Sequence, residues 1–69
     1  MKNRIEEIRK GRGMRQEELA ARLCVSRQTI SSLENGRYNP SITLAFQIAK
    51  LFALQIEDIF LYEEEDGDE

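Results

Sequence analysis

Residues 16–37 constrain the fold of this 69-residue chain most, because they predict two short helices joined by a tight turn. Apolar residues recur at helical spacing in two groups, one on each side of Val25. These residues are Leu19, Ala20, Leu23, Ile30 and Leu33. Ser26 can cap the second helix through its side-chain oxygen, and Gly36 stands where a helix ends in a left-handed residue. The outer face of the second helix is left polar, with Arg27, Gln28, Ser31 and Ser32.

The rest of the chain predicts three more helices, one before this pair and two after it. Residues 3–11 form the first, with Asn3 as its cap and Glu6 in the position that completes a capping box. Residues 41–52 form the fourth, which begins at a serine cap and carries one apolar stripe. Residues 56–60 form a short fifth helix. We therefore expect an all-α domain.

The chain after the fifth helix has an apolar part and an acidic part. Phe60, Leu61 and Tyr62 are too apolar for a solvated tail, so they could form a short strand or a contact between subunits. Residues 63–69 contain six acidic residues and no hydrophobic one, a composition typical of disorder. We assign residues 1–62 to one domain and the remainder to an acidic, disordered tail.

The charged residues are segregated along the chain, although the formal net charge is −3. Residues 1–37 contain nine of the ten Lys and Arg residues against five acidic ones, a balance of +4. Residues 38–69 contain one Lys against eight acidic residues, a balance of −7. A local positive face attracts phosphate whatever the overall sum, so a nucleic acid remains a plausible partner.

Size and composition exclude several classes of protein. A core this small contributes only about 3–5 kcal/mol, which favours support from well-packed helices and from a second subunit. The lone Cys24 and the absence of histidine exclude an internal disulfide and argue against a metal site. The carboxylate pairs Glu17–Glu18 and Glu57–Asp58 have no histidine beside them, so we expect no catalytic residues, no enzyme activity and no cofactor.

No apolar run approaches the roughly 18 residues that span a bilayer, and no signal peptide is visible. We expect a cytoplasmic protein with no membrane partner and no small-molecule ligand.

Four segments together identify a family: Arg15–Ala20, Val25–Ser31, Leu33–Arg37 and Asn39–Ser41. In this order they resemble the Xre/Cro type of helix-turn-helix domain, also called lambda-repressor-like, over about residues 3–60. The resemblance implies a fold of five helices, with the helix-turn-helix at 16–36 and its second helix in the major groove of DNA.

The resemblance also implies which residues contact DNA. Gln16, the first residue of the first helix of the helix-turn-helix, would bind a phosphate, at a helix N-terminus that already favours an anion. Base edges would be read by Arg27, Gln28, Thr29 and Ser32. Asn35 and Arg37 would contact the backbone, and we add the nearby cations Arg15 and Lys10. Arg pairs bidentately with guanine and Gln with adenine, each with about 1–3 kcal/mol of discrimination.

Two positions of the motif need comment. Cys24 stands in the tight turn where family members commonly have glycine, and a positive φ there would cost about 1 kcal/mol. Glu34 would be repelled by DNA, so we expect it to bind a structural partner, either Arg22 or a backbone N–H.

We predict a sequence-specific transcriptional regulator, a repressor, that binds a palindromic operator in double-stranded DNA as a homodimer. The second subunit would contact the fifth helix and the segment after it, at Ile56, Ile59, Phe60, Leu61 and Tyr62. The alternative is an antitoxin or another protein-binding module that captures a partner protein through this C-terminal segment.

Overall fold

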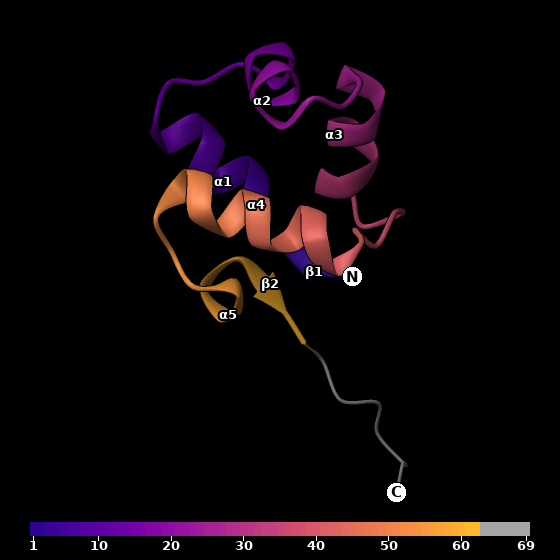
Figure 1. Cartoon of the computed structure of the whole chain (residues 1–69), viewed down its shortest axis with the longest axis vertical. Coiled ribbons are helices and arrows are strands. Elements are labelled where there is room, and N and C mark those ends of the chain that lie inside the picture. Colours follow the sequence, from indigo (N-terminus) through magenta and orange to yellow (C-terminus); the bar gives the residue numbers. More distant parts are fainter. Residues whose placement is uncertain (63–69) are drawn as a thin grey trace, which may run out of the picture.

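The computed structural model of the chain describes residues 1–62, so the predicted disordered tail lies outside the described residues. Five helices and two short strands make up the described part (Figure 1). The helices are α1 (Ile5–Gly11), α2 (Gln16–Leu23), α3 (Arg27–Glu34), α4 (Ile42–Phe52) and α5 (Ile56–Ile59). The strands are β1 (Lys2–Asn3) and β2 (Phe60–Leu61). The predicted five-helix fold is confirmed, and so is the short strand after the fifth helix.

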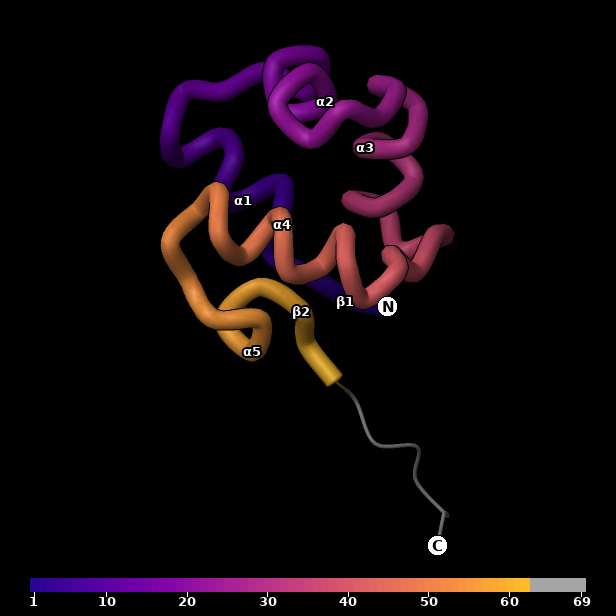
Figure 2. Tube along the Cα trace, in the orientation of Figure 1, coloured from indigo at the N-terminus to yellow at the C-terminus, as the bar shows by residue number. Residues whose placement is uncertain are grey.

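The two strands bring the start of the chain beside the end of its described part. They are antiparallel, with Lys2 opposite Leu61 and Asn3 opposite Phe60. Beyond them, the backbone N–H of Arg4 donates to the carbonyl oxygen of Ile59 at 2.7 Å. The indigo start and the yellow end of the tube therefore lie side by side (Figure 2).

The sequence prediction for the first helix was wrong at its start. Asn3 belongs to β1, and α1 begins two residues later at Ile5. The Asn3 side chain accepts a hydrogen bond from the Ile5 N–H at 3.0 Å and donates to the Leu33 carbonyl at 2.7 Å. Glu6 does not complete a capping box, because the N-cap residue is Arg4 and Glu6 is only the second residue of the helix; its carboxylate forms an ion pair with Lys10 instead. Asn3 thus ties the strand to α1 and α3.

The serine caps of α3 and α4 form as predicted. The Ser26 hydroxyl accepts from the N–H of Thr29, and the Ser41 hydroxyl accepts from the N–H of Leu44, each at 3.1 Å. Each side chain satisfies an N–H that would otherwise lack a partner in the first turn of its helix.

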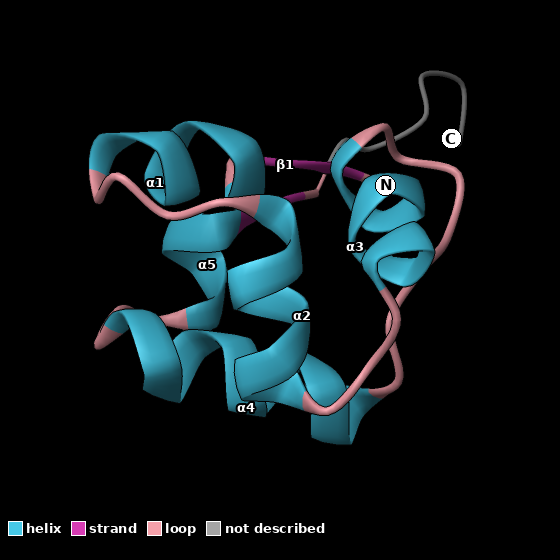
Figure 3. Cartoon of the chain, turned by 90° about the horizontal axis from the view of Figure 1, so that it is seen from above, coloured by secondary structure: helices cyan, strands magenta, loops and turns pink. Residues whose placement is uncertain are grey.

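One hydrophobic core holds the five helices together. Its fully buried side chains come from every helix: Ile5, Leu19, Ile30, Leu33, Ile48, Phe52 and Ile59. Val25 and Met14 are half-buried against it, as expected for residues that fill the corners between helices. The helices pack around this core with α3 at one edge of the molecule (Figure 3). One long side of α3 is therefore left open.

Candidate nucleic-acid interface

The burial of α3 determines which of its side chains face outward. Ile30 and Leu33 are fully buried, whereas Arg27 and Gln28 are exposed. Thr29, Ser31 and Ser32 are partly exposed. The outward face of α3 is thus polar from its first turn to its last, as the helical spacing predicted.

The first residues of α2 and α3 contact each other through their side chains. The Arg27 guanidinium donates to the amide oxygen of Gln16 at 3.4 Å. The amide nitrogen of Gln16 donates in turn to Glu34 at 3.0 Å. An amide NH₂ has two N–H donors, so one remains available to another acceptor. This pairing of a guanidinium and an amide is the centre of the candidate interface.

A buried ion pair fixes this arrangement from behind. Arg9 of α1 donates to both carboxylate oxygens of Glu34, at 2.6 and 3.3 Å, and to the Met14 carbonyl at 2.8 Å. The side chains of Arg9 and Glu34 are 8% and 5% exposed, and their hydrogen bond raises the pKa of Arg9. A fork of this kind is geometrically specific and strong for a charged pair.

The partner that we expected for Glu34 was wrong. Arg22 instead lies 3.9 Å from Glu18 on its own helix. The sequence did carry a signal for the correct pair. Arg9 follows the core residue Ile5 by four positions, and Glu34 follows the core residue Ile30 by four positions. Both charged residues therefore occupy positions that face the core.

The remaining cations and polar residues of the predicted site are all exposed. Arg15 is the N-cap residue of α2, directly before Gln16. Asn35 and Arg37 lie just after α3, where the Asn35 side chain accepts from the Arg37 N–H at 3.0 Å. Gly36 between them has a φ of +82°, in the left-handed region that favours glycine. The sequence prediction that the chain turns here is confirmed.

Lys10 lies on α1, whereas the other predicted phosphate-binding residues lie on or beside the helix-turn-helix. Its ammonium lies 2.9 Å from the carboxylate of Glu6, and this hydrogen bond lowers the pKa of Glu6. Glu6 in turn lines a shallow hollow with Gln16, Ser31, Glu34 and Asn35. Lys10 is thus paired with a residue that lines this hollow but does not line it itself, whereas Gln16 and Asn35 do.

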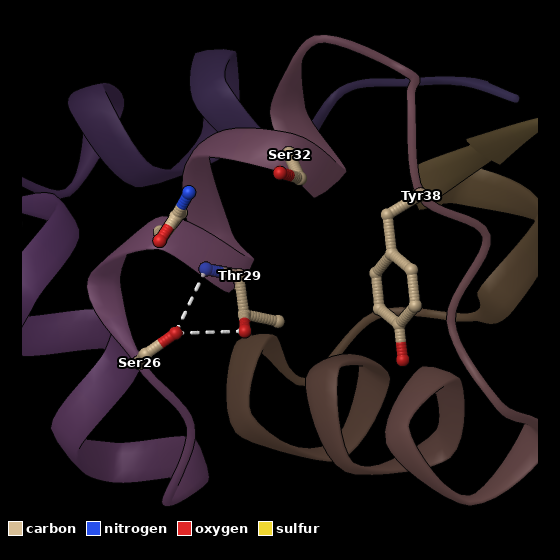
Figure 4. Close-up of a pocket in the computed structure, with 5 residues that line it drawn as sticks. Ser26, Thr29, Ser32 and Tyr38 are labelled. Carbon is tan, nitrogen blue, oxygen red and sulfur yellow. Dashed lines mark hydrogen bonds between the residues drawn. The ribbon is translucent and has the colours of Figure 1, made fainter.

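A second hollow lies on the outward face of α3. One residue that lines it, Tyr38, was not predicted to belong to the site. The volume of the hollow is about 220 Å³, and it is lined by Ser26, Gln28, Thr29, Ser32 and Tyr38. Tyr38 comes from the loop after α3, and its ring stands across the hollow from Thr29 (Figure 4). The signal in the sequence was a single aromatic residue within the polar run from Asn35 to Asn39.

The C-terminal residues that we predicted as a contact between subunits are not all accessible. Ile59 and Phe60 are buried in the core of the same chain, at 0% and 8% exposure, so they can only support such a surface. Ile56 and Leu61 are half-buried, and Tyr62 is 80% exposed.

An apolar groove of about 340 Å³ lies beside these residues. It is lined by Met1, Asn39, Pro40, Ile42, Ala45, Ile56, Glu57, Phe60 and Tyr62. On α4, Ile42 at its rim is 72% exposed, and Phe46, one turn further along, is 58% exposed. Neither residue was predicted to belong to an interface, because both lie outside the buried apolar stripe of α4.

Residues 1–62 contain no group of three or more His, Cys, Asp and Glu that could hold a metal ion. None of the helices α1–α5 is long and apolar enough to cross a membrane.

Comparison with known proteins agrees with this geometry. A family model described as "Helix-turn-helix" matches residues 5–59, which include all five helices, and the chain belongs to this family. The family is the Xre or lambda-repressor-like class of DNA-binding regulators of transcription, which are not enzymes. The predicted resemblance is confirmed.

Two of the relatives match over nearly their whole length. The chain is 52% identical to an uncharacterized HTH-type transcriptional regulator of Methanocaldococcus jannaschii, over 96% of this chain and 100% of that protein. It is 45% identical to YgzD, an uncharacterized HTH-type transcriptional regulator of Bacillus subtilis, over 94% of this chain and 98% of that protein.

The crystal structure of a transcriptional regulator from Listeria innocua has the same fold. It superposes with a TM-score of 0.75 at 22% identity, over 100% of this chain and 68% of the Listeria chain.

Proposed function

We propose that this protein is a sequence-specific regulator that binds double-stranded DNA with α3 in the major groove. Arg27, Gln28, Thr29 and Ser32 read base edges in this proposal. The observation that carries it is the Arg27–Gln16 contact at 3.4 Å, which sets a guanidinium and an amide together at the start of two exposed helices. These two groups have the donors that major-groove bases and phosphates accept.

The proposed phosphate contacts lie on both sides of the base-reading residues of α3. Gln16 keeps one amide N–H for a phosphate oxygen while the other bonds Glu34. Arg15 stands beside it at the start of α2, where the helix dipole also favours an anion. Asn35 and Arg37 extend the contact past the end of α3. Lys10 is the weakest member, because its ammonium is already paired with Glu6.

The test is the variant Arg27→Ala, assayed on an operator selected from random duplexes and on an unrelated duplex. We expect it to lose about 1–3 kcal/mol of discrimination while it keeps weak, salt-dependent binding. Arg22→Ala is the matched control, because Arg22 is an exposed arginine of α2 that pairs with Glu18 and lies outside the proposed contacts. If Arg27→Ala retains full preference for the operator, α3 is not the reader.

We further propose that the protein binds a palindromic operator as a homodimer and represses transcription by occupying it. A single α3 reads only a few base pairs, and one subunit covers part of the 1,000–2,500 Å² that is typical of specific complexes. Two α3 helices must then lie about 34–36 Å apart, one turn of DNA. Such a protein acts in the cytoplasm, where it meets the DNA.

The apolar groove with Ile42 and Phe46 is the surface that we propose for the second subunit. Each copy has protruding apolar side chains on α4 next to a groove that accepts such side chains, which suits a twofold contact in which both copies use the same patch. The lining of the groove includes no Lys or Arg, so it suits protein better than DNA. This proposal keeps Ile56, Leu61 and Tyr62 from the sequence prediction and adds α4.

A different protein in this groove is the alternative function. A chain that stays monomeric would favour it, and the measurement of oligomeric state described in the Discussion separates the two.

A further inference from the structure

The hollow on α3 differs in chemistry from the other hollow of the candidate interface. We call it the hydroxyl hollow, because four of its five lining residues carry a hydroxyl: Ser26, Thr29, Ser32 and Tyr38, with Gln28 as the fifth. No carboxylate lines it, whereas Glu6 and Glu34 both line the hollow of about 200 Å³ at the other side. An anion is therefore repelled at the hollow that Glu6 and Glu34 line, and it is not repelled at the hydroxyl hollow.

Tyr38 is held in place at the hollow while its hydroxyl stays free. Its backbone N–H donates to the Ser32 carbonyl at 3.3 Å, which ties the residue to the last turns of α3. The side chain is 44% exposed, and within residues 1–62 no hydrogen bond engages its hydroxyl. The Ser26 and Thr29 hydroxyls instead bond each other at 2.9 Å (Figure 4). Tyr38 therefore presents a positioned donor without a partner in the described chain.

We propose that the hydroxyl hollow binds the sugar-phosphate backbone of the DNA strand beside α3, with the Tyr38 hydroxyl donating to a phosphate oxygen. This inference rests on the proposed function, because Gln28, Thr29 and Ser32, which that function assigns to base reading, line the same hollow. The backbone contact belongs to Tyr38, which stands across the hollow from Thr29 (Figure 4). Tyrosine hydroxyls are among the groups that bind DNA phosphates, and such contacts fix the register of a recognition helix. The tyrosine ring closes the hollow next to Ser32 and would pack against the sugar.

A pair of conservative variants tests the role of this hydroxyl. Tyr38→Phe removes only the phenolic oxygen, and we expect affinity for the selected operator to fall about tenfold for each subunit bound, as for a lost hydrogen bond to a charged group. Thr43→Val is the matched control, because it also removes one hydroxyl, and Thr43 is an exposed residue of α4 that lines neither hollow nor the apolar groove. Its affinity for the operator should equal that of the parent. Thermal unfolding of both variants should match the parent.

The salt dependence distinguishes a neutral donor from a cation. Loss of the Tyr38 hydroxyl should weaken binding at every salt concentration without changing the slope of log K against log salt. Arg37→Ala should reduce that slope by about one unit for each subunit bound. A changed slope in Tyr38→Phe would overturn the proposed neutral contact.

Operators with single methylphosphonate linkages locate the phosphate. At one linkage, replacement of the charged oxygen should lower the affinity of the parent protein. On that modified duplex, Tyr38→Phe and the parent should bind with equal affinity. If the defect of Tyr38→Phe persists on every modified duplex, the hydroxyl contacts a base, and the backbone proposal is wrong. If only Tyr38→Ala, and not Tyr38→Phe, loses affinity, the ring acts by packing alone, and the phosphate contact is again wrong.

Failure of this inference can be told apart from failure of the proposed function. Only the role of Tyr38 would be overturned if Tyr38→Phe binds the operator as tightly as the parent while Arg27→Ala loses its preference for the operator. A parent protein that selects no sequence from random duplexes would overturn both.

Discussion

Two residues other than glycine end helices in the left-handed backbone conformation. Cys24 closes α2 with φ 60°, and Ala53 closes α4 with φ 57°. Both side chains are exposed, so neither gains burial in return for the unfavourable backbone. The strain at Cys24 was expected from its place in the turn, whereas the sequence around Ala53 gave no such signal.

We predict that Cys24→Gly stabilises the protein by roughly 0.5–1 kcal/mol. Relief of a left-handed non-glycine residue is worth about 1–2 kcal/mol, and the greater freedom of glycine in the unfolded chain offsets part of it. Ala21→Gly, at an exposed position inside α2, is the control and should destabilise by about 1 kcal/mol. Urea denaturation measures both changes, and a destabilised Cys24→Gly would contradict the strain argument.

Among the elements, α1 does more than complete the bundle. Its Arg9 reaches Glu34 at the end of α3 and the Met14 carbonyl before α2. Glu34 then holds the amide of Gln16, at the start of α2. One buried guanidinium thereby sets the angle between the two helices of the motif.

We predict that Glu34→Gln lowers the free energy of unfolding by about 3 kcal/mol, because it leaves the Arg9 cation buried without its counter-charge. The double variant Arg9→Met with Glu34→Leu should recover most of this loss. Glu18→Gln is the control, since it breaks only the exposed pair with Arg22 and should cost less than about 0.5 kcal/mol. Equal stability of Glu34→Gln and the parent in urea would show that the pair is not important for stability.

These elements also show what the sequence could and could not predict. Helical spacing and the serine caps are local signals, and they correctly predicted α2, α3 and the start of α4. Strand β1 has only two residues, and it forms because β2, far along the chain, lies beside it. No local sequence pattern therefore predicts it. Local spacing did place Arg9 and Glu34 at core-facing positions, but it could not pair them, because their contact spans 25 residues of sequence.

At the candidate site the outward residues of α3 followed from periodicity, but the contribution of Tyr38 did not. Its place depends on how the loop after α3 folds back on Ser32, which is a tertiary contact. Likewise, Ile59 and Phe60 looked available because their burial depends on the strand pairing. The DNA contacts themselves stay predictions.

Across the whole molecule, the polar face of α3 and the apolar groove meet at one loop. Asn35 and Arg37 lie at the start of this loop, on the side of the proposed DNA contacts, and Tyr38 lines the hydroxyl hollow. Asn39 and Pro40, directly after them, line the apolar groove. A second copy bound in the groove would therefore lie beside the C-terminal end of α3. In this arrangement, dimer formation would directly set the distance between two reading helices.

We predict that Phe46→Asp converts a dimer into a folded monomer, because it places a charge in the exposed apolar patch of α4 that would be desolvated between subunits. Gln47→Asp is the matched control, since the neighbouring Gln47 lines a different hollow with Arg22 and Lys50. Sedimentation at tens of micromolar should show dimers for the parent and the control and monomers for Phe46→Asp. The monomer should bind one half-site weakly and lose the preference for a palindrome. A parent chain that sediments as a monomer, or a Phe46→Asp variant that stays dimeric, would show that this groove is not the contact between subunits.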